Sequence, residues 1–150
     1  MVVITVIAVL STMVVYGLSS AQASARDVQR EQMMTGIQTA LEKYYADNQA
    51  YPDGGANGWG YFCPSMNILV TKGYLPSMPV DPSTKTTICP TVTQHDGNVL
   101  SVWYIYAPSG YIWNGHASPC ASSITYLPNA YELAFNKELG GAATYFCSPN

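Results

Sequence analysis

Apolar and polar positions divide the N-terminal third of this chain into an uncharged run and an amphipathic stretch, with no break between them. The uncharged run is MVVITVIAVLSTMVVYGL, residues 1–18, and no proline occurs before Pro52. Beyond it, apolar residues recur at steps of three and four, the spacing of one helix face: Met34, Ile37, Leu41 and Tyr44. The pattern predicts one helix over residues 2–47, which at a rise of about 1.5 Å per residue would be roughly 69 Å long.

The uncharged run admits three interpretations: a removable secretory signal, a single-span membrane anchor, or the N-terminal helix of a filament subunit. Eighteen helical residues cover roughly 27 Å, just short of the usual hydrocarbon thickness of about 30 Å. Residues 21–23, Ala-Gln-Ala, resemble a signal cleavage site, but no Lys or Arg precedes the run and the helical pattern continues through the site. We favour the filament helix, because so long a rod exceeds what a 150-residue globule can bury, and other molecules are expected to cover its first half.

Charged residues first occur just past the uncharged run, as a mixed-charge collar: Arg26, Asp27, Arg30 and Glu31. Their ordinary interpretation is a solvated helix face, and Lys43 with Asp47 has the spacing of an i,i+4 ion pair. Asp47-Asn48 followed by Tyr51-Pro52 is expected to end the helix, because a residue before proline is driven out of the helical region.

Composition limits what the rest of the chain can be. The hundred or so residues after the helix can hold one domain with a single core. The formal charge is −3 and 10% of residues are charged, so no basic stripe is present to follow a nucleic-acid backbone. Residues 99–131 contain no Asp, Glu, Lys or Arg, and part of this segment is therefore expected to face a sheet, a core or another subunit.

Short apolar segments after residue 52 indicate an antiparallel sheet. Residues 53–58 and 79–82 are expected to be loops, and residues 68–75 a short helix or turn that ends at Pro76. Strands are predicted where β-branched and aromatic residues gather: 99–106, 111–113, 123–127, 131–135 and 144–147, with a turn at 107–110. The chain is therefore predicted to be α+β, with the amphipathic half of the helix covering the sheet.

Four cysteines follow the long helix: Cys63, Cys89, Cys120 and Cys147. An even set without a CxxC pair favours two disulfides in an oxidising compartment over a zinc site, which only His95 and His116 could complete. Four cysteines allow three pairings, and we favour Cys63–Cys89 with Cys120–Cys147, because each closes a loop of similar size; nested or crossed pairings stay open. Each such loop is expected to contribute on the order of 3 kcal/mol.

No catalytic site is evident. Neither histidine has an acid or nucleophile at a known spacing, and the chain has no GxSxG, HExxH or phosphate-binding loop, so we expect no enzyme, no cofactor and no catalytic or metal site. The competing function is a membrane-anchored surface module that grips glycan or protein through Trp59, Trp103 and Trp113. Aromatic residues in strands are, however, more often core than ligand platform.

A series of short motifs in a fixed order resembles the type IV pilins and the major pseudopilins of type II secretion. The series is Ala25-Arg26-Asp27, Gln29-Arg30, IQTALEKYYADN over residues 37–48, Tyr51-Pro52, Lys72-Gly73-Tyr74-Leu75 and Pro79-Val80-Asp81-Pro82. Together the motifs span roughly residues 1–85, and the last 65 residues match in style only. Members of that family carry a phenylalanine and a glutamate just before the apolar run, whereas residues 1–4 here resemble the segment after that glutamate. A short stretch is thus expected to precede Met1, and if Met1 is the true start, Thr5 stands where the acid would be. The acid clusters of calcium-binding pseudopilins are not matched either, since only Glu132 and Glu138 follow Asp96.

The resemblance implies a pilin fold, with residues 1–23 as membrane anchor and filament core and residues 24–150 as the globular domain. That domain would comprise the helix half 24–48, a loop region 49–98, and the sheet with its C-terminal disulfide, 99–150. It implies a major pilin of an extracellular helical filament, or alternatively a pseudopilin of a secretion or DNA-uptake system. The implied partners are further copies of the chain, the cytoplasmic membrane before assembly, a prepilin peptidase and the pilus assembly machinery. Apolar residues surround the predicted helix on most sides, as expected of a filament core: Val2, Val3, Ile4, Val6, Ile7, Val9, Leu10, Val14 and Val15.

Overall fold

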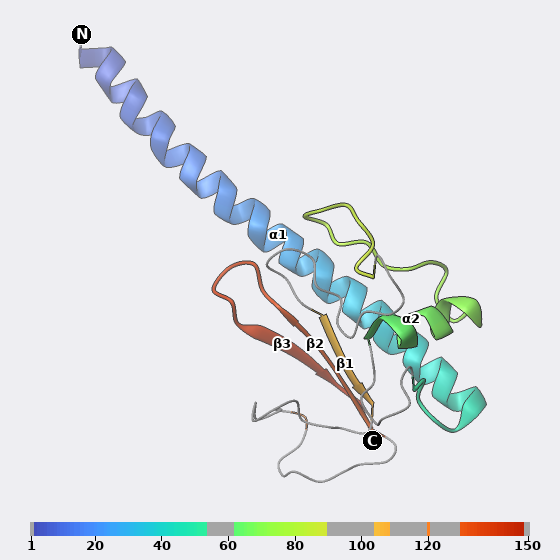
Figure 1. The fold of residues 1–150 in the computed structure, drawn as a ribbon. Helices are drawn as coiled ribbons and strands as arrows, with labels where there is room; N and C mark the ends of the chain where they lie inside the picture. Colours follow the sequence, from blue (N-terminus) through green and yellow to red (C-terminus); the bar gives the residue numbers. More distant parts are fainter. Residues whose placement is uncertain (1, 54–61, 90–103, 109–119, 121–129, 149–150) are drawn as a thin grey trace.

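A computed structural model describes residues 2–53, 62–89, 104–108, 120 and 130–148. These contain two helices, α1 (Val2–Asn48) and α2 (Phe62–Thr71), and three strands, β1 (Tyr104–Pro108), β2 (Tyr131–Asn136) and β3 (Ala143–Cys147). The chain is α+β as predicted: a long N-terminal helix projects from a body in which its second half lies along a small sheet (Figure 1).

Helix α1 is continuous over 47 residues, which confirms the helix predicted from the sequence to within one residue at its end. Its length follows from the absence of proline, since proline would remove a backbone donor and clash with the preceding turn. The helix stops where Gln49 adopts a positive φ of 56°, with the Gln49 amide still donating to the Tyr45 carbonyl at 2.8 Å. A left-handed residue just past the last turn is a common way for a helix to end.

Helix α2 begins earlier than the sequence suggested. Of the helix or turn predicted at 68–75, residues 68–71 are the last turn of a ten-residue helix that starts at Phe62, and residues 72–75 follow it as a turn. Pro64 lies in its first turn, where the backbone amides have no intrahelical acceptor and proline therefore costs little. Gly73, with φ of 81°, lets the chain reverse, and the Tyr74 amide then donates back to the Leu69 carbonyl at 2.8 Å.

The three strands form an antiparallel sheet in the order β1-β2-β3. Strands β2 and β3 match the strands predicted at 131–135 and 144–147 to within one residue. Strand β1 overlaps the end of the strand predicted at 99–106, but it continues through Pro108, where the sequence suggested a turn. Proline is tolerated there because β1 is an outer strand of the sheet that the described residues form. The strands predicted at 111–113 and 123–127, and most of the loop at 53–58, lie outside the described residues.

The core lies between α1, α2 and one face of the sheet. The predicted helix face is confirmed: Met34, Ile37 and Leu41 are buried, and Tyr44 packs against the same cluster. Opposite them, alternate strand residues of the sheet are also buried: Tyr104, Tyr106, Tyr131, Leu133 and Phe135. Full burial of one such apolar side chain contributes about 1.5–3 kcal/mol, so this cluster holds the second half of α1 firmly on the sheet.

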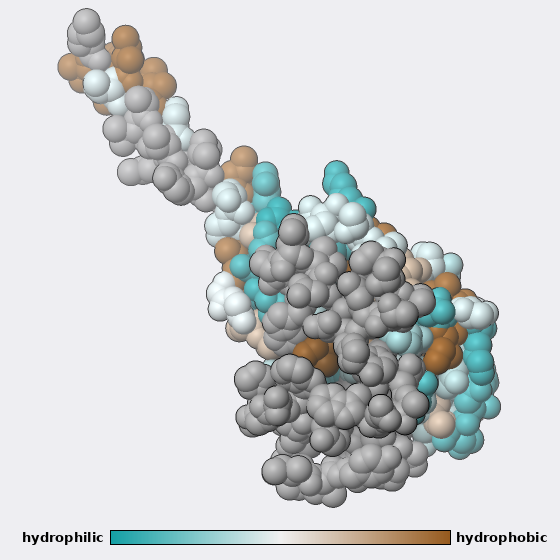
Figure 2. Space-filling model, in the orientation of Figure 1, coloured by the Kyte–Doolittle hydropathy of each residue, from teal (hydrophilic) through white to brown (hydrophobic). Residues whose placement is uncertain are grey.

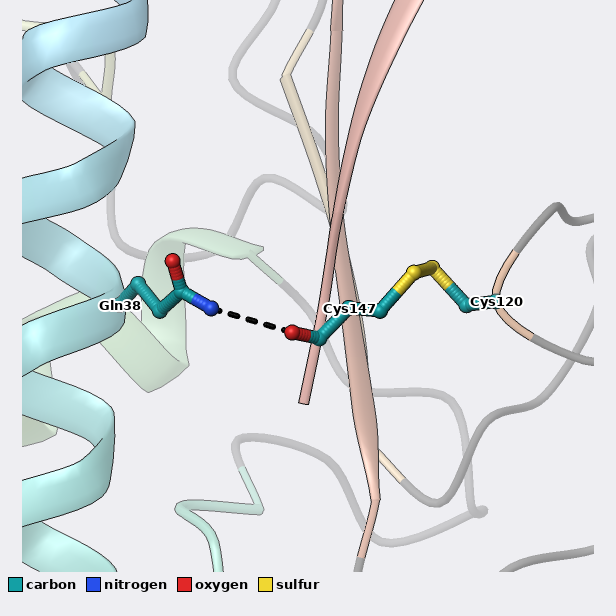
Figure 3. The surroundings of a disulfide bond; sticks show 3 residues. All are labelled: Gln38, Cys120 and Cys147. Carbon is teal, nitrogen blue, oxygen red and sulfur yellow. Dashed lines mark hydrogen bonds between the residues drawn. A yellow bond between two sulfur atoms is a disulfide. The ribbon is translucent and has the colours of Figure 1, made fainter. Parts of the chain in front are cut away.

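Two disulfides close the body, Cys63–Cys89 and Cys120–Cys147, which are the pairs that the sequence favoured. The first ties α2 to the loop that ends at Cys89. The second departs from β3 on the side away from α1, while the carbonyl of Cys147 accepts a hydrogen bond from Gln38 Nε2 at 3.0 Å (Figure 3). Strand β3 is thus fastened to the helix on one side and to Cys120 on the other.

Candidate functional site

The N-terminal part of α1 is an apolar arm that the body does not cover. We define the arm as residues 2–22, because Ala23 is the first residue of α1 whose described side chain is buried. Six predicted filament-core residues have described side chains, and their exposed fractions run from 51% for Val6 to 76% for Val2: Val2, Val3, Ile4, Val6, Ile7 and Leu10. Apolar atoms gather at the free end of the arm (Figure 2). Val9, Val14 and Val15 lie in the same helix, with side chains outside those that the structure describes.

Across the described residues, neither helix contains a stretch that is both long enough and apolar enough to cross a membrane.

Where the arm meets the body, the charged collar is not the solvated surface that the sequence suggested. Arg30 has 0% of its surface exposed, and Asp27 is buried beside it. Both residues continue the buried helix face at steps of three and four, N-terminal to Met34. The prediction was wrong for these two residues because segments far away in the sequence cover them: Arg30 pairs with Asp81 and Glu138, and Asp27, which pairs with Arg30, also accepts from the Glu138 amide.

The Arg30 guanidinium bonds to three carboxylates at once. Nε and Nη2 donate to the two oxygens of Asp81, at 2.9 and 3.3 Å. Nη1 donates to Asp27 Oδ1 at 2.8 Å and to Glu138 Oε2 at 3.1 Å. The planar, forked guanidinium suits such a site, because it can hold one carboxylate with two bonds and still reach others. Despite burial, these bonds raise the pKa of Arg30 above its usual value, so the side chain stays charged.

Asp81 is the deepest acid of the cluster and is fully buried. It lies in a tight loop in which the Ile88 amide donates to the Pro79 carbonyl at 3.0 Å, so the predicted rigid loop at 79–82 serves to present this carboxylate. Besides Arg30, the Ser83 amide donates to it at 2.8 Å, and the hydroxyls of Ser83 and Tyr104 also donate. Burial alone would raise the pKa of Asp81, but Arg30 and these donors outweigh it and hold the pKa well below its ordinary range.

The turn between β2 and β3 supplies the other half of the cluster. Arg26 Nε donates to Glu138 Oε2 at 2.9 Å, and Arg26 Nη2 donates to the other oxygen. The hydrogen bond from Arg26 is the main cause of the lowered pKa of Glu138. The Glu138 amide donates in return to Asp27 Oδ1 at 3.1 Å. A more exposed pair, Lys137 Nζ to Glu31 Oε1 at 3.2 Å, lies at the edge.

We call this set the charge cluster: Arg26, Asp27, Arg30, Asp81 and Glu138. Its two guanidinium groups and three carboxylates are bonded to one another, so it joins three parts of the chain, α1, the 79–88 loop and the β2–β3 turn. These bonds hold the three segments in a fixed position relative to one another. In the described part of the chain, no group of three or more His, Cys, Asp or Glu side chains is placed to hold a metal ion.

Other residues singled out by the sequence are placed differently. Lys43 and Asp47 form no ion pair in the described residues, and Asp47 accepts a hydrogen bond from the Tyr74 hydroxyl at 2.8 Å. His95, His116, Trp59, Trp103 and Trp113 lie outside the described residues. The spacing of Asp27 and Arg30 could have revealed the charge cluster, since both continue the helix face of Met34 at steps of three and four.

No protein family, curated protein or solved structure matches this chain. Two features of the structure therefore bear on function. One is an apolar arm that its own body leaves uncovered. The other is a charge cluster that fastens the base of the arm to that body.

Proposed function

We propose that this chain is the structural subunit, a major pilin, of a type IV pilus-like helical filament in which copies pack through their arms. The observation that carries the proposal is the exposure of the apolar arm. Burying one valine, leucine or isoleucine completely is worth about 1.5–3 kcal/mol. Six such side chains are each half exposed or more, so covering all of them should contribute on the order of 5–10 kcal/mol of binding free energy per subunit.

The arrangement of the arm favours several helical neighbours over one flat partner. Consecutive residues of an α-helix are about 100° apart, so Val2, Val3 and Ile4 point to different sides of it. All three are at least 69% exposed. A bundle of identical helices covers a rod from all sides, and it buries the arm of every copy alike.

The ordered motifs over residues 25–82 and the α+β layout support a pilin fold for the body. In this proposal the arm lies in the cytoplasmic membrane before assembly, after processing by a prepilin peptidase, and among other arms afterwards. Two disulfides agree with a body that folds outside the cytoplasm. Pseudopilins share this layout, and the proposal concerns assembly rather than the task of the fibre.

The test compares two valines that are equally exposed in the single chain. Val6 lies on the arm and is 51% exposed, and Val80 lies on the body and is 50% exposed. Val6→Glu and Val80→Glu add the same charge at the same degree of exposure, so they should affect the folded monomer similarly. In a filament core, however, an unpaired carboxylate costs several kcal/mol. We expect Val6→Glu to abolish filaments seen by electron microscopy and Val80→Glu to leave them intact.

Two results would overturn the proposal. Normal filaments from Val6→Glu would show that the arm is not the polymer core. A wild-type chain that stays monodisperse in detergent, and forms no fibre after the detergent is removed, would favour the anchored binding module instead.

A further inference from the structure

The arm is long compared with the length of helix that supports it. From Val2 to Gln22 it extends roughly 30 Å at about 1.5 Å per residue. The residues of α1 in or against the apolar core cluster run from Met33 to Tyr45, a supported length of roughly 18 Å on the same rise, and Ala23 is buried apart from that cluster. A swing of about 10° at the base would therefore move the tip of the arm by roughly 5 Å, about the rise of one helical turn.

The charge cluster lies between the arm and the apolar contacts. Asp27 and Arg30 lie N-terminal to Met34, so their bonds extend the supported part of α1 by about two turns towards the arm. The partners come from two separate segments: Asp81 belongs to the 79–88 loop and Glu138 to the β2–β3 turn, which lies beside the middle of α1 (Figure 1). Two different parts of the body therefore bond to α1 at the base of the arm.

Ionic hydrogen bonds restrain direction in a way that apolar packing does not. Burial of apolar surface is non-directional, so it does not by itself fix an angle between two groups. A bidentate bond between a guanidinium and a carboxylate fixes distance, plane and angle together. Arg30 makes such a bond to Asp81, and Arg26 makes another to Glu138.

We propose that the charge cluster is a positioning device that sets the direction in which the apolar arm leaves the body. Arg26 and Glu138 close the side of the cluster nearest the arm, and Arg30 with Asp81 forms its buried centre. Its importance for assembly rests on the proposed filament function, because a polymer with one helical geometry needs every body to hold its arm at the same angle.

The test measures the spread of distances between the tip of the arm and the body. Spin labels on Ile4→Cys and Thr71→Cys, both exposed positions, are attached to the full chain with its disulfides intact. Pulsed electron-spin resonance in detergent then gives the distance distribution. We expect Glu138→Gln to broaden it at least twofold. The matched control is Lys137→Met, which removes the neighbouring exposed pair to Glu31 and is expected to leave the width unchanged, since exposed pairs are weak.

Arg26→Met is the second variant, and it keeps the test decisive if Glu138→Gln fails to fold. It removes the bonds from Arg26 and leaves those of the buried Arg30 in place. An unchanged width in a folded variant would overturn the proposal, as would equal broadening by Lys137→Met. The distance measurement needs no polymer, so failure of the wild-type chain to form fibres would refute the filament function alone. If fibres do form, we expect several-fold fewer from either cluster variant.

Discussion

Replacing Arg30 by methionine removes a guanidinium that bonds to three carboxylates while keeping a side chain of similar reach. Removing one partner of a buried ion pair costs about 3–5 kcal/mol, because the other charge stays buried without compensation. Here Asp81 keeps donors from Ser83 and Tyr104, so we expect a loss near the lower end, about 3 kcal/mol. Urea unfolding of the full chain at pH 7, in mild detergent and with disulfides intact, measures this loss as a shift of the midpoint.

The pH dependence of the Arg30→Met effect is a second readout. The lowered pKa of Asp81 means that its ion pair stabilises the fold above the ordinary carboxyl pKa of about 4, and that this contribution is lost as pH falls through the folded value. In Arg30→Met the Asp81 carboxyl should take up its proton at higher pH, which relieves the buried charge. The difference in free energy of unfolding between wild type and Arg30→Met should therefore be smaller at pH 3 than at pH 7. A variant within about 1 kcal/mol of wild type at pH 7, or an equal difference at both pH values, would refute the reasoning.

Three further predictions use the same unfolding measurement. Cys120→Ser with Cys147→Ser opens a loop of 27 residues and should cost about 3 kcal/mol; an unchanged midpoint would mean that this bond adds nothing. Burial raises the pKa of Glu132 to about 6, so wild-type stability should fall as pH rises from 4.5 to 6, and Glu132→Gln should remove that part of the slope. At Gly36, in the middle of α1, an added Cβ meets nothing within 4 Å. Gly36→Ala should therefore stabilise the helix by up to about 1 kcal/mol and raise the melting temperature, and a lowered one would reveal a contact at that face.

The elements that could be predicted from the sequence are those with a local cause. Helix α1 follows from a proline-free stretch with a 3.6-residue period, and β2 and β3 follow from short runs of aromatic and β-branched residues. The start of α2 was not predicted, and its first turn contains Pro64, a residue that the first turn of a helix accepts. Even the disulfide pairs could be chosen by loop length, a property of the sequence alone.

The charge cluster could not be predicted in the same way. Arg30 lies 51 residues from Asp81 and 108 from Glu138, and no local period connects positions so far apart. Taken alone, a charged residue on a helix is most often solvated, which is why the collar suggested an exposed surface. Only the fold brings the three segments together, and only then do carboxylates compensate the buried charge of Arg30.

The charge cluster also has a consequence for sequence variation among relatives of this chain. A buried arginine that is lost while its acids remain leaves an orphaned charge, whereas replacing the whole set by apolar residues of similar volume can be neutral or even stabilising. Positions 27, 30, 81 and 138 should therefore change together or not at all. Positions 31 and 137, which form the exposed pair, should instead vary independently of each other. Joint change at positions 27, 30, 81 and 138 is therefore a feature by which distant relatives of this chain can be recognised.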